Sequence, residues 1–162
     1  MTIPAPEVLL TMPARPEGVG VVRQALAGMA DALDFDPTVL ADMKMAVTEA
    51  CTNVVVHAYD EDAGMLEVEM LADENGLTIV VRDHGAGIQP RPARSEPPAL
   101  GLGLPLIAAL SDAFELKGSA GQGTEVRMTF AYSRNADPAT ANPVTGNVGA
   151  DGRWDPDAES PA

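Results

Sequence analysis

Glu49 and Asn53 are the first residues along this chain whose types and spacing suit a chemical reaction. They are four residues apart, so on a helix their side chains lie on one face, about one turn from each other. The amide oxygen of Asn53 is a suitable ligand for a Mg²⁺ ion that carries nucleotide phosphates. The carboxylate of Glu49 can accept a proton from an attacking hydroxyl or water. Taken alone, the pair is also typical of a solvated helix face.

A second candidate group, Asp83-His-Gly-Ala-Gly87, closes an apolar stretch that is predicted to be a strand. A carboxylate at Asp83 can accept a hydrogen bond from an exocyclic amine such as that of adenine. Gly85 and Gly87 would let the base approach the backbone closely. By itself, the group is equally typical of an ordinary Asp-Gly turn.

A third group, Gly101-Leu-Gly-Leu-Pro-Leu106, opens a predicted helix. Gly101 and Gly103 leave the first amides of that helix accessible to an anion, and Leu104 completes this part of the candidate nucleotide site. A loop that simply needs glycine is the alternative. Between the second and third groups lies a proline-rich segment. Its Arg91 and Arg94 can reach phosphate oxygens if the segment closes as a lid, or they are solvated.

Two familiar kinds of site are absent from the sequence. It contains no Gly-x-x-x-x-Gly-Lys-Ser/Thr segment, and neither glycine pair completes Gly-x-Gly-x-x-Gly. No cluster of histidines and cysteines suggests zinc. The three groups, in this order, therefore predict a nucleotide pocket that has no lysine-bearing phosphate loop.

Composition limits the partners of this 162-residue chain, which is long enough for one domain with a proper core. A net charge of −14 argues against direct nucleic-acid binding and favours solubility or a basic protein partner. The single cysteine, Cys51, is predicted to be a small core residue and fits a reducing cytosol. We expect a cytoplasmic protein without membrane contact, because neither a signal-peptide pattern nor a membrane-length apolar stretch is present.

Hydrophobic periodicity and turn residues predict the elements that position these groups. The expected helices cover residues 16–33, 37–59 and 102–111, and the expected strands cover 7–12, 66–70, 77–81, 114–117 and 126–132. Tight turns between neighbouring strands predict an α+β two-layer sandwich, with a mixed, largely antiparallel sheet and the helices on one face. The domain is expected to span residues 1–132, followed by an acidic, Pro/Ala-rich disordered tail over 133–162.

The three groups together resemble the motifs of the Bergerat-fold (GHKL) ATPases. Glu49 and Asn53 resemble the asparagine box of that family, Asp83 to Gly87 its first glycine box, and Gly101 to Gly103 its second. Gly123-Thr124 resembles the short motif whose threonine helps to hold adenine. The helix over residues 42–59 is further similar to that of the bacterial anti-sigma factor serine kinases of the RsbW and SpoIIAB type. The resemblance covers residues 7–131.

This resemblance implies a fold, an activity and a set of partners. ATP and Mg²⁺ would bind in the pocket, with Asn53 on Mg²⁺, Asp83 on adenine, and Glu49 as the base for a serine hydroxyl. The protein would sequester an alternative sigma factor and phosphorylate a STAS-type anti-anti-sigma antagonist. Arg23 matches a position that grips partners, and a homodimer is implied. A non-catalytic ATP-binding module that switches partners without kinase activity is the alternative.

Overall fold

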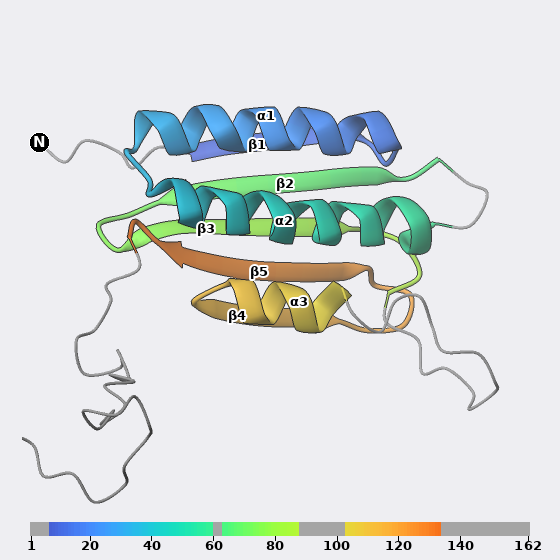
Figure 1. Cartoon of the computed structure of the whole chain (residues 1–162). Coiled ribbons are helices and arrows are strands. Elements are labelled where there is room, and N and C mark those ends of the chain that lie inside the picture. Colours follow the sequence, from blue (N-terminus) through green and yellow to red (C-terminus); the bar gives the residue numbers. More distant parts are fainter. Residues whose placement is uncertain (1–6, 60–62, 88–102, 134–162) are drawn as a thin grey trace, which may run out of the picture.

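The computed structural model describes residues 7–59, 63–87 and 103–133, which form one sheet with helices packed on one face (Figure 1). The strands are β1 (Glu7–Pro13), β2 (Met65–Ala72), β3 (Gly76–Asp83), β4 (Ala113–Gly118) and β5 (Thr124–Ala131). The helices are α1 (Pro16–Ala32), α2 (Pro37–Asn53) and α3 (Gly103–Leu110), and a π-helical segment, η1 (Val54–Ala58), extends α2. The tail predicted over 133–162 lies outside the described residues except for Ser133.

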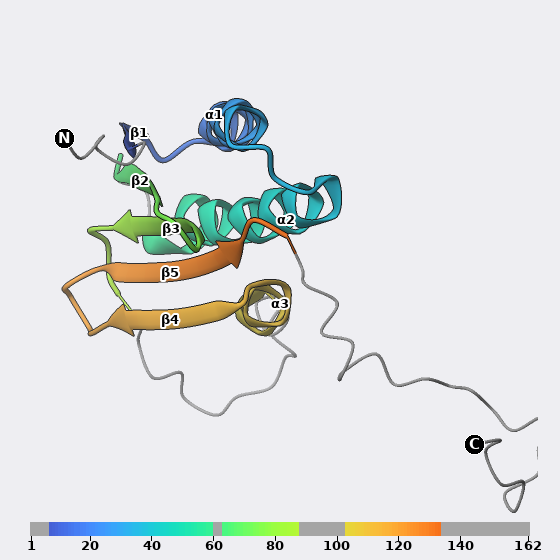
Figure 2. The same cartoon turned by 90° about the vertical axis from the view of Figure 1, so that its left-hand side faces the viewer.

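The sheet has the strand order β1-β2-β3-β5-β4, and each neighbouring pair is antiparallel. Figure 2 shows the strands in one layer and the three α-helices in the other. The predicted two-layer α+β sandwich is therefore confirmed. The sheet was expected to be mixed, but among the described strands every pairing is antiparallel, because β5 lies between β3 and β4, which run in the same direction and do not pair with each other.

Local sequence signals account for the start of the helix that carries Glu49 and Asn53. Asp36 caps α2, since its carboxylate accepts hydrogen bonds from the Thr38 amide at 2.8 Å and the Thr38 hydroxyl at 2.6 Å. These bonds hold the pKa of Asp36 below its usual value. Pro37 follows at the first helical position, where its missing N–H leaves no bond unmade. This start fixes which residues of α2 face the sheet.

The core lies between the sheet and the helices. The face of α2 that contacts it carries the fully buried Met43, Val47 and Ala50, and alternate residues of β2 and β3 meet it from the sheet. Leu66, Val68 and Met70 are all completely buried, as their alternation with glutamates predicts. None of the described helices is long and apolar enough to cross a membrane.

Cys51 belongs to this core, as the sequence predicts, and is fully buried. Burial raises the pKa of its thiol to about 12. At pH 8 only roughly one thiol in ten thousand would then be the reactive thiolate. We expect a disulfide reagent such as Ellman's to leave the folded protein unmodified at pH 8 and to titrate one thiol once urea unfolds it. Rapid modification of the folded protein would contradict this burial.

Candidate functional site

Glu49 and Asn53 lie at the end of α2, and both face the first residue of α3. A methyl group built on Gly103 would lie 3.4 Å from Oε2 of Glu49, 3.4 Å from Nδ2 of Asn53 and 3.5 Å from its Oδ1. Gly103 itself is buried. The fold thus brings the first and third candidate groups, fifty residues apart in the sequence, into direct proximity. A larger residue at position 103 would fill the space beside both side chains.

Asp83 ends the central strand β3 and is the one buried charged residue in the described part of the chain, with 6% of its surface exposed. Its Oδ1 accepts a hydrogen bond from the Gly85 amide at 2.9 Å. Within the described residues no side-chain or backbone donor is found for the second oxygen, Oδ2. The carboxylate is therefore held by one oxygen and offers the other as an acceptor.

The backbone after Asp83 runs close against the end of η1. The Ala86 amide donates to the Ala58 carbonyl at 3.0 Å, a carbonyl left free at the helix end. Only glycine fits at position 85, because a Cβ there would overlap the same carbonyl oxygen. Gly87 adopts a φ of +71°, which glycine reaches without strain. Gly85 thus allows a close backbone approach to η1, and Gly87 allows one to the Ser119 carbonyl in the turn before β5, while contact of either glycine with adenine stays a prediction.

The end of the predicted helix over 37–59 is not a regular α-helix. The α-helical hydrogen bonding ends at Asn53, and Val54–Ala58 form a wider π turn. Single π turns are frequent at functional sites, because the added residue changes the direction of neighbouring side chains and carbonyls. Here the π turn begins directly after Asn53 and presents the Ala58 carbonyl to the loop after Asp83.

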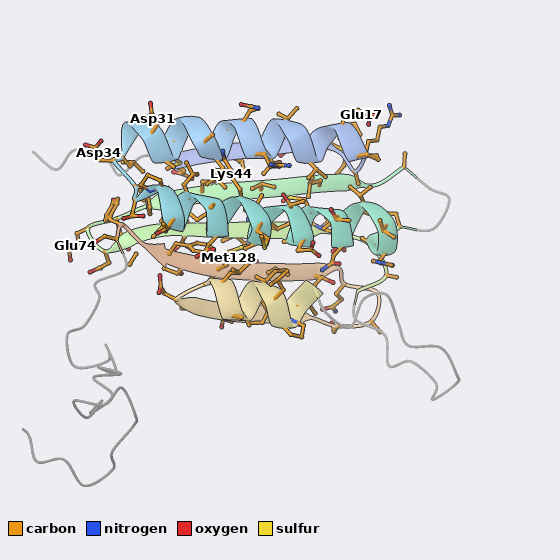
Figure 3. All side chains as sticks on the ribbon, viewed as in Figure 1. Glu17, Asp31, Asp34, Lys44, Glu74 and Met128 are labelled. Carbon is orange, nitrogen blue, oxygen red and sulfur yellow. The ribbon has the colours of Figure 1, made fainter. Side chains whose placement is uncertain are left out.

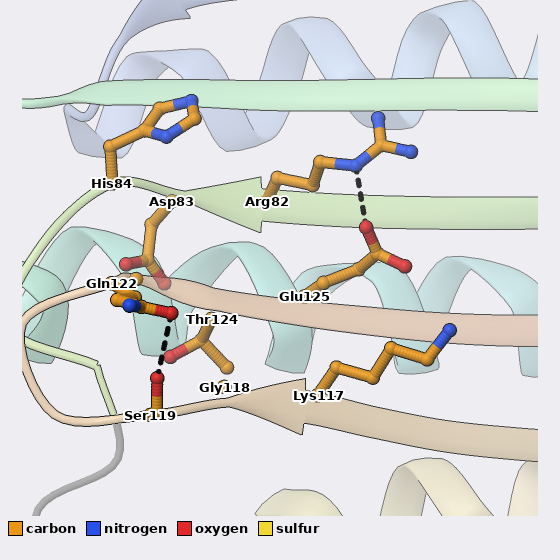
Figure 4. Close-up of a pocket in the computed structure, with 10 residues that line it drawn as sticks. Arg82, Asp83, His84, Lys117, Gly118, Ser119, Gln122, Thr124 and Glu125 are labelled. Carbon is orange, nitrogen blue, oxygen red and sulfur yellow. Dashed lines mark hydrogen bonds and ion pairs between the residues drawn. The ribbon is translucent and has the colours of Figure 1, made fainter.

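Thr124 lies directly opposite Asp83 in the register of β3 and β5. Figure 4 shows the two side chains on neighbouring strands at the end of the sheet. A cavity of about 390 Å³ opens here, and its lining consists of Arg82, Asp83, His84, Lys117, Gly118, Ser119, Gln122, Gly123, Thr124 and Glu125. Glu49 and Asn53 are not part of that lining. Its lining thus includes Asp83 and Thr124 together with residues of the sheet face that the helices leave open.

The open sheet face beside this cavity carries a network of ion pairs. The guanidinium of Arg82 contacts Glu69 at 2.8 Å and Glu125 at 2.7 Å. The pKa of Glu125 lies below its ordinary value, chiefly because of the hydrogen bond from Arg82, which in turn raises the pKa of Arg82. Val80 lies on this face and is fully buried. The charged side chains thus cover apolar surface as well as pairing.

We expect Glu125→Gln to lower the free energy of unfolding at pH 7 by less than about 1 kcal/mol, since solvent screens the pair. Because folding depresses the Glu125 pKa, its contribution is present above the ordinary value of 4.5 and is lost as pH falls through the lowered pKa. Urea denaturation at pH 7 and pH 3 should show a larger difference from wild type at pH 7 than at pH 3. Glu74→Gln, in an exposed turn, is the control; equal effects at both pH values would contradict the assignment.

For the other predicted site residues, the structure shows only how exposed they are or does not describe them. Arg23 is exposed on α1, and Leu104 is half-buried against the core. Gly101, Arg91 and Arg94 lie outside the described residues. Among the described residues, no group of three or more histidine, cysteine, aspartate and glutamate side chains is arranged to hold a metal ion. The metal-binding role of Asn53 stays a prediction.

One residue of the site was not predicted from the sequence. Tyr59, directly after η1, donates its hydroxyl to the Met65 carbonyl at 2.7 Å and accepts a hydrogen bond from the His84 amide at 2.9 Å. No local pattern marks such a residue, because both partners come from other segments of the chain. Its position at the end of the predicted helix was the only available signal.

Comparisons with known proteins identify the family of this chain. A family model described as "Histidine kinase-like ATPase domain" matches residues 12–130. The serine-protein kinases RsbW of Bacillus cereus (strain AH820) and Bacillus anthracis (strain A0248) are each 33% identical over 151 residues, covering 86% of this chain and 93% of their own.

Two solved structures are similar in fold. The crystal structure of the RsbU and RsbW domains of a Mycobacterium tuberculosis protein matches with a TM-score of 0.61 and 25% identity, over 78% of this chain and 32% of that chain. The histidine kinase domain of a blue-light activated histidine kinase from Erythrobacter litoralis matches with a TM-score of 0.50 and 19% identity, over 75% and 62%. The second likeness concerns the fold alone.

Proposed function

This chain belongs to the family of histidine kinase-like ATPase domains, and from that premise we propose that it is an ATP-dependent anti-sigma factor with serine kinase activity. It would sequester an alternative sigma factor and phosphorylate a serine of a STAS-type anti-anti-sigma antagonist. The observation that carries the proposal is the convergence of Glu49 and Asn53 on Gly103 at the start of α3. Relatives that match most of the chain are named serine-protein kinases.

The residues present fit a magnesium nucleotide. A protein site that supplies only one or two oxygen ligands suits Mg²⁺, which takes its remaining ligands from phosphates and water, so Asn53 alone is an adequate protein ligand. The lack of a side chain at Gly103 leaves space beside Glu49 and Asn53. The second oxygen of Asp83, without a donor among the described residues, suits an exocyclic amine. These features support a nucleotide that extends from Asp83 toward α3.

Each side chain would then have one role. Bound ATP supplies a phosphoryl group to the serine hydroxyl of the antagonist, with ADP as the leaving group. Glu49 accepts the hydroxyl proton as the new oxygen–phosphorus bond forms and the bond to the leaving oxygen of ADP breaks. Asn53 holds the metal, and Asp83 orients the adenine ring. Gly101, Arg91 and Arg94 would contribute to the phosphate end.

Capture of a sigma factor requires a surface away from this reaction. Arg23 is exposed on α1 and is available to a protein partner. The net charge of −14 suits a partner with a basic surface, as a DNA-binding protein has. We propose that the protein acts as a homodimer in the cytoplasm. The two protein partners would then compete for it, and it would not contact nucleic acid.

The test is phosphotransfer from labelled Mg·ATP to the STAS proteins encoded by the same organism, together with co-purification of its alternative sigma factors. We expect one STAS protein to gain one phosphate on serine and one sigma factor to co-purify. Binding of Mg·ATP and a sigma factor without transfer to any STAS protein would replace the kinase with the non-catalytic module. Failure of the folded protein to bind Mg·ATP would overturn both forms of the proposal.

A further inference from the structure

Tyr59 links three segments that meet at the predicted adenine end of the site. It follows η1 in an extended conformation, with φ −126° and ψ 136°. Its hydroxyl donates to the Met65 carbonyl at the start of β2 and accepts from the His84 amide just beyond β3. One hydroxyl thus donates a hydrogen bond to one strand and accepts another from the neighbouring loop.

The tyrosine ring is fixed as well as its hydroxyl. The ring lies against Gly64, where a Cβ would overlap three ring atoms, so a side chain at position 64 would displace it. The ring is half-buried. Because the aromatic ring has few rotatable bonds, packing on Gly64 and two hydrogen bonds leave the hydroxyl little freedom.

Three consecutive amides after Asp83 are each bonded, and two of their acceptors belong to the chain just after α2. The His84 amide donates to Tyr59 Oη at 2.9 Å, and the Ala86 amide donates to the Ala58 carbonyl at 3.0 Å. The amide between them, that of Gly85, donates to Asp83 Oδ1 at 2.9 Å. The orientation of the Asp83 carboxylate therefore depends on a loop held by Ala58 and Tyr59.

This arrangement joins the two halves of the candidate site. Asn53 is six residues before Tyr59, in the last turn of α2, and η1 is the connection between them. A shift of the loop after Asp83 relative to η1 would change the separation of Asp83 from Asn53. Since a nucleotide has a fixed reach from base to phosphates, that separation must match it for both ends to bind.

We infer that Tyr59 is a positioning residue for nucleotide binding: its hydroxyl holds the backbone after Asp83 so that the Asp83 carboxylate contacts adenine. The inference rests on the proposed function, because it assumes a nucleotide in this site. It predicts an effect on affinity rather than on the chemical step, since the partners of the Tyr59 hydroxyl are the backbone groups of Met65 and His84 and not Glu49.

The chain provides a matched control for the test. It contains two tyrosines, and the other, Tyr132, also donates its hydroxyl to a backbone carbonyl, that of Asp73, at 2.6 Å. Asp73 precedes the turn into β3, at the opposite end of the strand from Asp83. Tyr59→Phe and Tyr132→Phe therefore each remove one hydroxyl-to-carbonyl bond, and only the first also removes the acceptor of an amide next to Asp83.

The experiment compares wild type, Tyr59→Phe and Tyr132→Phe by calorimetric titration of Mg·ATP and by urea denaturation. We expect both variants to lose stability, Tyr59→Phe more than Tyr132→Phe, because the first loses two hydrogen bonds of its hydroxyl and the second loses one. Only Tyr59→Phe should bind Mg·ATP more weakly, by about five- to tenfold. Its phosphotransfer rate at saturating ATP should stay within about twofold of wild type. The His84 amide should exchange with solvent faster in this variant alone.

The possible outcomes separate the two proposals. Suppose that the wild-type protein binds Mg·ATP. If Tyr59→Phe then binds it equally well, or if Tyr132→Phe binds it as weakly as Tyr59→Phe does, the role of Tyr59 is overturned and the proposed function stands. Unchanged exchange of the His84 amide would also overturn it. A folded wild-type protein that binds no Mg·ATP would overturn the proposed function, and the role of Tyr59 with it.

Discussion

Glu49→Gln is expected to reduce phosphotransfer to a STAS substrate by about 10²- to 10⁴-fold, the range typical for loss of a general base. Glutamine has nearly the shape of glutamate, so the position of the side chain beside Gly103 and the packing of α2 on α3 are kept. It lacks a carboxylate that can accept the proton of the serine hydroxyl. Single-turnover transfer from labelled Mg·ATP measures the change, and calorimetry should find Mg·ATP affinity within a few-fold of wild type.

The control for this substitution is Glu74→Gln, the same chemical change in the exposed turn at the other end of the sheet, where Figure 3 shows the side chain. It should transfer phosphate at the wild-type rate. Glu49→Ala should be as inactive as Glu49→Gln, since both lack the base. Undiminished transfer by either variant at Glu49 would exclude this residue as the base and would leave the kinase proposal in need of another one.

Asp83→Asn is expected to weaken Mg·ATP binding by about ten- to a hundredfold, the cost of losing a hydrogen bond to a charged group. The asparagine carbonyl oxygen can still accept the bond from the Gly85 amide, so the loop after β3 keeps its main local contact. Its amide group would then face the exocyclic amine of adenine, which places two donors opposite each other. Calorimetric titration of Mg·ATP into both proteins measures the loss.

Asp31→Asn is the matched control for Asp83→Asn. Asp31 is exposed near the end of α1 (Figure 3), at the opposite end of the sheet from the end of β3 that carries Asp83 (Figure 1). It carries the same loss of one negative charge, so it reports any general effect of net charge on the binding of an anionic nucleotide. Equal affinities for wild type and Asp83→Asn would mean that the base does not contact Asp83. Equal losses in both variants would assign the effect to charge alone.

Local patterns alone determined most of the secondary structure. Asp36-Pro37 predicts the start of α2 and, through the helical period, that Glu49 and Asn53 share a face. The turn at Asn75-Gly76 is confirmed, with the Asp73 carboxylate accepting from both amides at 2.7 and 3.1 Å. Alternation along β2 predicts which of its residues are buried. These features depend on residues near one another in the chain, so the sequence displays them directly.

The tertiary structure alone decided how the candidate residues meet. The placement of Gly103 beside Glu49 and Asn53 depends on packing between α2 and α3, which no local spacing specifies. The position of β5 between β3 and β4 puts Thr124 opposite Asp83. The π turn after Asn53 and the two bonds of Tyr59 involve backbone groups, which every residue carries and no motif marks. The sequence by itself therefore determined which residues have the chemistry for a nucleotide, while long-range packing and backbone hydrogen bonds decided their arrangement.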